Sequence, residues 1–77
     1  MAGDKTDAQT WQDVALAYMR VAAHFPDSPL TPRALLTVAQ IEQQKLNDAT
    51  AARSLYQQIV RQYPNDPAAA TANEQLR

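Results

Sequence analysis

Apolar residues recur every three or four positions along most of the chain, which is the spacing of one face of an α-helix. The first apolar stripe covers residues 11–25, and Pro26 ends it because proline lacks a backbone N–H and clashes with the preceding turn. Three further stripes cover residues 34–41, 49–63 and 68–76. No stretch of strand length alternates with period two, so the pattern predicts an all-α chain of about four helices. The stripe positions are Trp11, Val14, Ala15, Tyr18, Val21, Ala22 and Phe25; Ala34, Leu35, Val38 and Ile41; Ala49, Ala52, Leu55, Tyr56, Ile59, Val60 and Tyr63; and Ala68, Ala69, Ala72 and Leu76.

Short turns with prolines and capping residues separate these helices, so neighbouring helices are expected to run antiparallel. Ser28 and Thr31 each precede a proline and each can cap the second helix. We expect Thr31, because a helix capped at Ser28 would place Pro32 where its missing N–H breaks the first helical hydrogen bond. The other expected caps are Asn47 or Asp48 for the third helix and Asp66, followed by Pro67, for the fourth.

The sequence repeats itself at an offset of 38 residues. Both copies contain an aromatic residue, a branched aliphatic residue, an aromatic-Pro pair, a capping residue before proline and then alanine, at the same intervals. A period of this length at the scale of helix–turn–helix is typical of a helical solenoid. The aligned pairs are Tyr18/Tyr56, Val21/Ile59, Phe25/Tyr63, Pro26/Pro64, Asp27/Asn65, Pro29/Pro67, Ala34/Ala72 and Val38/Leu76.

The stretch from Ala34 to Pro64 resembles one complete tetratricopeptide repeat. In this resemblance Ala39 takes the small-residue position of the first helix, and Ala52 and Tyr56 take the small and aromatic positions of the second. The resemblance implies a fragment of an α-solenoid built from antiparallel helix–turn–helix repeats. The implied repeat domain covers residues 9–77, with one full repeat near 33–64 between half repeats at 9–26 and 66–77.

Two motifs, over residues 18–28 and 56–66, narrow the resemblance to one subclass of these repeats. They are similar to repeats of bacterial cell-envelope proteins, such as the Tol–Pal system accessory protein and the lipoproteins of outer-membrane β-barrel assembly. The chain departs from the family pattern at Leu35 and Glu42, where aromatic residues are usual. The resemblance implies a location in the periplasm or cell envelope, while the sequence itself carries no targeting signal.

The composition argues against several classes of function. The 7 Lys and Arg residues nearly balance the 8 Asp and Glu residues, for a formal charge of −1, so we expect no nucleic-acid partner. With no Cys, and with Gly3 as the only glycine, the chain has no disulfide framework, zinc knuckle or phosphate-binding glycine loop. The longest apolar run, residues 14–19, is far shorter than the roughly 20 residues that cross a bilayer, so no membrane insertion is expected. Residues 1–8 are interpreted as a flexible lead-in or an expression remnant.

Side chains suited to catalysis are few and scattered. His24 is the only histidine, and we expect it half exposed at a helix C-terminus, where the negative end of the helix favours it. Ser28 and Ser54 have no neighbouring base, so a catalytic triad has no support. The sequence therefore predicts no catalytic residue, no metal site, no cofactor and no enzymatic activity.

The aromatic residues Trp11, Tyr18, Phe25, Tyr56 and Tyr63 lie on the apolar stripes and are expected to pack in the core. For Trp11 another role stays open, because it begins the first helix, where an upstream neighbour would otherwise be needed to cover it. A second apolar group on the first helix lies off its main stripe. Such a group either packs against a neighbour on the second side of a solenoid helix or forms an exposed patch for a partner helix or peptide. Its members are Leu16, Met19 and Ala23.

The tetratricopeptide resemblance also implies a recognition surface, because the first helix of each unit lines the concave face of such arrays. The side chains expected there are mostly neutral and rich in amides, which suits hydrogen bonding to an extended peptide backbone; a solvated helix face explains the same residues. The implied function is a non-enzymatic protein–protein interaction or scaffolding module with a protein or peptide partner. The expected partner-binding residues are Arg33, Leu36, Gln40, Gln43, Gln44, Thr71 and Glu74.

Two alternatives to this function remain open. The repeats can act as a structural spacer appended to a larger enzyme or secretion component. They can also form a self-association segment, with a homodimer through the exposed repeat ends, because solenoid ends without polar caps tend to pair.

Overall fold

The structure, a computed structural model, describes residues 8–77 and contains four helices in that range: α1 (Ala8–His24), α2 (Thr31–Gln44), α3 (Ala49–Gln62) and α4 (Pro67–Leu76). No strand occurs among these residues, so the all-α prediction is confirmed. The lead-in predicted for residues 1–8 lies outside the described residues, apart from Ala8, which begins α1.

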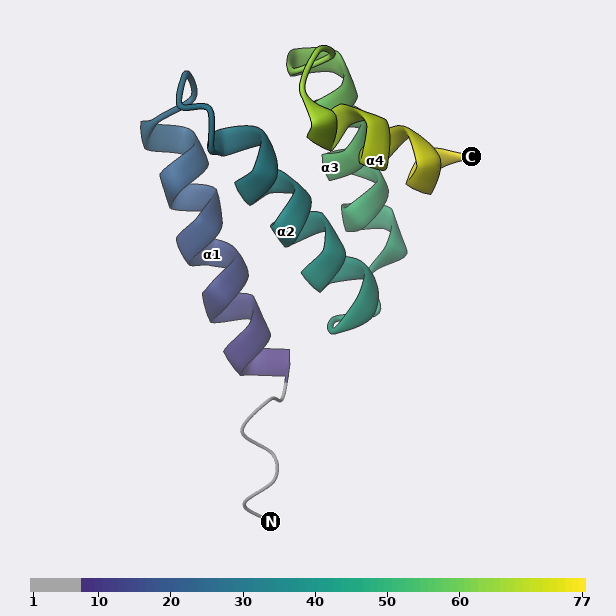
Figure 1. Cartoon of the computed structure of the whole chain (residues 1–77). Coiled ribbons are helices and arrows are strands. Elements are labelled where there is room, and N and C mark those ends of the chain that lie inside the picture. Colours follow the sequence, from purple (N-terminus) through teal and green to yellow (C-terminus); the bar gives the residue numbers. More distant parts are fainter. Residues whose placement is uncertain (1–7) are drawn as a thin grey trace.

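Helix α2 lies between α1 and α3 and runs antiparallel to both (Figure 1). Helix α4 packs along α3 and also touches α2. Helix α2 contacts each of the other three helices, which makes it the central element of the fold. The predicted antiparallel helix–turn–helix arrangement is therefore confirmed.

The core consists of two clusters that meet on α2. The larger cluster joins α2, α3 and α4 and contains five alanines, which let the helices approach closely. The smaller cluster joins α1 to α2. The larger cluster comprises Leu35, Ala39, Ala52, Tyr56, Ile59, Ala68, Ala69 and Ala72, and the smaller one Ala15, Val38 and Ile41.

Two of the predicted helix caps are confirmed. The Asp48 carboxylate accepts a hydrogen bond from the backbone N–H of Ala51 at 3.0 Å. The Asp66 carboxylate accepts from the N–H of Ala68 at 2.9 Å, with Pro67 in the first turn of α4. Each bond satisfies a donor that the helix itself leaves unpaired.

The predicted cap at Thr31 is wrong. Thr31 is the first residue of α2, the cap position is Leu30, and no side chain caps the helix there. The Thr31 hydroxyl instead donates to the Phe25 carbonyl. Pro32 has no N–H to donate to the carbonyl of Ser28, so regular bonding begins only when Ala34 N–H donates to the Leu30 carbonyl at 2.9 Å.

The offset of 38 residues seen in the sequence is also a repeat of the backbone structure. The loops after α1 and α3 contain the same hydrogen bonds at equivalent positions, including a side-chain acceptor at Ser28 in one loop and Asp66 in the other. The equivalent backbone bonds are Phe25 N–H to Val21 and Tyr63 N–H to Ile59; Ser28 N–H to Phe25 and Asp66 N–H to Tyr63; and Thr31 N–H to Ser28 and Ala69 N–H to Asp66.

The inward face of α1 differs from the predicted stripe. Met19 packs against both core clusters, although it was expected off the stripe, whereas its predicted companions Leu16 and Ala23 are exposed. Tyr18 and Phe25, expected in the core, are exposed. The reason is that α2 packs along only one side of α1 and so covers only one of its two apolar faces.

Trp11 is covered by the end of α2 and the turn that follows it. It is partly buried against the smaller core cluster, and the Lys45 ammonium lies 5.2 Å from the centroid of its ring. A cation over an aromatic face is attracted by the ring quadrupole. The expected core role of Trp11 is therefore confirmed in part.

The turn between α2 and α3 holds the backbone of Asn47 in the left-handed conformation. Asn47 is the one non-glycine residue with positive φ in residues 8–77, at 53°. Asn tolerates this left-handed region better than residues with a larger or apolar side chain. We expect Asn47→Ala to lower the free energy of unfolding by about 1 kcal/mol and Asn47→Gly to lower it less, as measured by urea denaturation. Equal losses in both variants would contradict this conformation.

A candidate interaction surface on α2 and α4

The predicted partner-binding residues lie on the two helices that were expected to carry them. Five are on α2 and two on α4, and these two helices touch each other. Their side chains do not form one continuous site. Some of them line one of two depressions, and the others are exposed to solvent outside both.

The first depression, the Arg33 cavity, lies where the N-terminal ends of α2 and α4 approach each other. It has a volume of about 190 Å³. Leu36 packs its side chain partly against the larger core cluster, and Thr71 is also partly buried. The Arg33 cavity thus combines a cation, an apolar floor and a hydroxyl. Its lining residues are Pro29, Arg33, Leu36, Asp66, Pro67, Ala68 and Thr71.

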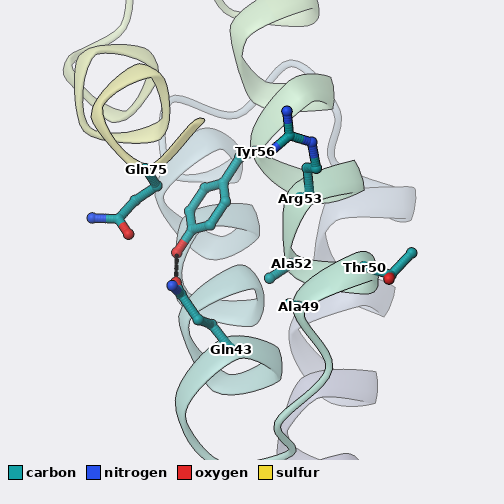
Figure 2. A pocket seen from close by; sticks show the side chains of 7 residues that line it. All are labelled: Gln43, Ala49, Thr50, Ala52, Arg53, Tyr56 and Gln75. Atoms are coloured by element: carbon teal, nitrogen blue, oxygen red, sulfur yellow. Dashed lines mark hydrogen bonds between the residues drawn. The ribbon is translucent and has the colours of Figure 1, made fainter. Parts of the chain in front are cut away.

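The second depression, the Gln43 cavity, lies at the opposite end of α2, beside the first turns of α3. Its volume is about 230 Å³. Figure 2 shows the Tyr56 ring projecting from α3, with Gln43 of α2 at its hydroxyl end and Gln75 of α4 beside it. The remaining lining residues are Ala49, Thr50, Ala52 and Arg53.

One hydrogen bond fixes the side chains at the Gln43 cavity. The Tyr56 hydroxyl donates to Oε1 of Gln43 at 2.8 Å (Figure 2). The Tyr56 ring is almost completely buried, and this burial raises the pKa of its hydroxyl. The hydroxyl therefore stays protonated and acts as the donor. The bond uses only Oε1 of Gln43, so the amide N–H₂ of Gln43 is not engaged by Tyr56. The bond holds Gln43 in place on the rim of the cavity.

The remaining predicted residues do not join either depression. Gln40, Gln44 and Glu74 are exposed and line neither the Arg33 cavity nor the Gln43 cavity. Conversely, Arg53 and Gln75 line the Gln43 cavity without having been predicted. The sequence argument considered only the first helix of each repeat, whereas the N-terminal turn of α3 also reaches this surface. Gln75 was detectable, because it lies one turn beyond Thr71 on the same helix.

The chemistry of both depressions is that of a shallow recognition surface. Sites for drug-sized molecules and cofactors usually enclose about 300–1,000 Å³, and each depression is smaller than that. Amide, hydroxyl and guanidinium groups can pair with the N–H and C=O groups of a peptide backbone. The arrangement can therefore hydrogen-bond a chain lying across α2 and α4.

His24 lies apart from these depressions. Its Nδ1 is 3.0 Å from the carbonyl oxygen of Arg20, at the exposed C-terminal end of α1. In residues 8–77, no group of three or more His, Cys, Asp or Glu side chains is placed to hold a metal ion.

Glu42 provides a pH-dependent contribution to stability. It lines the groove between α1 and α2, where burial, and secondarily the charge of Asp48, raise its pKa. A carboxyl with a raised pKa in the folded state stabilises the fold fully at a pH below its unfolded pKa, and this contribution is lost as the pH rises through the folded value.

We expect the effect of Glu42→Gln on the free energy of unfolding to be more favourable at pH 7 than at pH 4. The difference between the two pH values should be small, up to about 0.5 kcal/mol. Urea denaturation at the two pH values measures the difference, and Glu74→Gln, on the exposed face of α4, serves as the control. The same pH dependence in both variants would contradict the assignment to Glu42.

None of the helices in the described part of the chain is long and apolar enough to span a membrane. No protein-family model, curated protein or solved structure matches this chain.

Proposed function

We propose that this chain is a non-enzymatic protein–protein interaction module that binds an extended peptide segment across α2 and α4. The observation that carries the proposal is the position of Arg33, Leu36 and Thr71. They come from two helices and line one cavity, and a second cavity at the other end of α2 carries the amides of Gln43 and Gln75 on its rim. A peptide about 20 Å long can use polar groups spaced along both helices.

The tetratricopeptide resemblance supports the same proposal. In such arrays the first helices of successive units line the peptide-binding face, and α2 and α4 take that place in the alignment at an offset of 38 residues. The motifs at residues 18–28 and 56–66 further support a role in the bacterial periplasm or cell envelope. The module would act by presenting a rigid surface, without a cofactor.

A peptide library displayed on phage and selected on the immobilised chain tests this proposal. Thr71→Arg would fill the Arg33 cavity, whereas Ala70→Arg adds the same side chain at an exposed neighbouring position that lines neither depression. We expect the selected peptides to bind Thr71→Arg at least about tenfold more weakly, equivalent to about 1.4 kcal/mol, and to bind Ala70→Arg as well as the unmodified chain.

The proposal fails if the selection yields only peptides that bind both variants equally, since their site would then lie elsewhere. Circular dichroism and the melting temperature of each variant show whether a loss of binding reflects a loss of fold. A Thr71→Arg variant that melts like Ala70→Arg and still loses the peptides supports the proposal.

A further inference from the structure

The outer face of α1 carries a row of mostly exposed apolar side chains. Tyr18 is 39% exposed, Val21 45% and Phe25 61%. They follow helical spacing along one side of α1 together with the exposed Ala17 and with Val14, which is partly buried against the smaller core cluster. We call these five residues the outer stripe. Val14, Ala17, Tyr18 and Val21 enclose a shallow depression of about 250 Å³.

The repeat shows what kind of element such a stripe accepts. At an offset of 38 residues, Tyr18 corresponds to Tyr56 and Val21 to Ile59, and these counterparts on α3 are 2% and 0% exposed. Val14 corresponds to Ala52, which is also buried. Tyr56 and Ile59 are therefore buried in one copy of the repeat, whereas Tyr18 and Val21 are open in the other.

Helix α2 supplies much of the cover for the stripe on α3. Leu35 and Ala39 belong to the same core cluster as Ala52, Tyr56 and Ile59. One turn further along α2, Gln43 accepts the hydrogen bond of the Tyr56 hydroxyl. The covering face thus has a branched aliphatic residue, an alanine and an amide at positions i, i+4 and i+8. Because Tyr18 keeps the hydroxyl of its counterpart, a helix with that face suits the outer stripe.

A second copy of the chain does not offer that face. Helix α4 is the counterpart of α2, but the positions corresponding to Leu35, Leu36 and Ala39 are Asn73, Glu74 and Arg77, which are polar and exposed. A polar outer face of this kind is typical of the capping end of a repeat protein. Helix α4 of one copy is therefore unsuited to dock on α1 of another.

Pairing of two outer stripes is also insufficient for a stable dimer. Such dimers bury about 800 Å² on each partner. Aromatic side chains have roughly 150–250 Å² in total. Because Tyr18 is 39% and Phe25 61% exposed, these two side chains supply only about 150–250 Å² together, and the smaller side chains of the stripe do not make up the difference. Transient complexes form through smaller areas, which suits the reversible docking of a single helix.

From these observations we infer that the outer stripe is a docking site for an amphipathic helix of a partner protein, whose face carries a branched aliphatic residue, an alanine and a glutamine or asparagine at i, i+4 and i+8. This surface lies on α1 and is separate from the two depressions on α2 and α4. The module would therefore have two binding surfaces, one for an extended peptide and one for a helix.

A peptide with the sequence of residues 27–48, which contains α2, is a suitable probe for the full chain. Titration followed by NMR chemical shifts is expected to give a dissociation constant of about 1 mM or tighter, with shifts at Tyr18 and Val21. Val21→Asp should weaken binding at least about tenfold. Leu16→Asp is the matched control, because Leu16 is also exposed on α1 but corresponds to the exposed Ser54 in the repeat.

If the free peptide does not bind, a fusion shows the reason: either its face does not fit the outer stripe, or the free peptide does not form a helix. Residues 27–48 placed directly before Trp11 reproduce the spacing of α2 and α3, because residue 49 corresponds to residue 11. Val21→Asp should then lower the melting temperature of the fusion by about 10 °C or more but that of the original chain by only a few degrees.

The remaining outcomes overturn the inference. If the fused helix docks but the free peptide and designed helices with the same face never bind, the stripe belongs to a contact within one polypeptide. If the chain alone dimerises in sedimentation equilibrium and Val21→Asp abolishes the dimer, the occupant is a second copy. If Val21→Asp and Leu16→Asp act alike in the fusion, the stripe does not accept a helix of this kind.

Discussion

Replacing Tyr56 with alanine is expected to lower the free energy of unfolding by about 3–5 kcal/mol, the usual cost of truncating a buried aromatic residue. Tyr56 is 2% exposed and belongs to the cluster that joins α2, α3 and α4. Truncation leaves a cavity between these three helices and removes the hydrogen bond to Gln43. Urea denaturation at pH 7 measures the loss.

Two variants separate the contributions to this loss. Tyr56→Phe keeps the ring and is expected to cost about 1 kcal/mol, the usual net value of one hydrogen bond. Tyr18→Ala removes the same side chain at the equivalent position of the other repeat, where it is exposed, and is expected to cost less than about 1 kcal/mol. Similar losses for Tyr18→Ala and Tyr56→Ala would show that α1 and α3 are covered alike, contrary to the structure.

Replacing Ala39 with leucine is expected to lower the free energy of unfolding by about 1–3 kcal/mol, because extra methyl groups in a packed core force shifts in the helices. Ala39 is completely buried and lies in one cluster with Ala52 and Ala72, which are also almost inaccessible. The close approach of α2 to its neighbours leaves no room for a larger side chain at this position.

Gln40→Leu is the matched control for Ala39→Leu. It introduces the same side chain at the next position, which is exposed, and should change the free energy of unfolding by no more than about 0.5 kcal/mol. Thermal denaturation of both variants checks the comparison. A neutral Ala39→Leu would mean that α2 faces its neighbours through a different side.

The helices and most of their ends could be predicted from the sequence because local rules determine them. Periodicity located all four helices, and Asp48 and Asp66 cap helices through bonds to nearby backbone groups. Thr31 was misjudged because two capping residues and two prolines lie within five positions. The proline at position 32 delays the regular helix without preventing Ser28 from bonding to Leu30.

Burial on α1 could not be predicted in the same way. The residues of α1 and α3 share one pattern, and the pattern does not tell whether a covering helix is present. Tyr18 and Tyr56 therefore looked equivalent, yet only Tyr56 is buried. Met19 illustrates the converse, because its inward position depends on how α1 rotates against α2.

The candidate site was predicted in part. The resemblance pointed to α2 and α4, and Arg33, Leu36 and Thr71 do line one cavity. Gln43 lies in a second depression because Tyr56 holds it there, a contact between residues 13 positions apart. Arg53 was missed because the start of α3 comes beside α4 only through the packing of the whole fold.

Native-state hydrogen exchange, resolved by residue, is the most direct test of the account that neighbouring helices cover the apolar face of α3 but leave the outer face of α1 open. Amide protection reports the free energy of local opening. We expect Tyr56 and Ile59 to exchange only through global unfolding, and their counterparts Tyr18 and Val21 to exchange through local opening of α1 at lower free energy. Equal protection of the two pairs would contradict the account, because the outer face of α1 would then be as firmly covered as the inner face of α3.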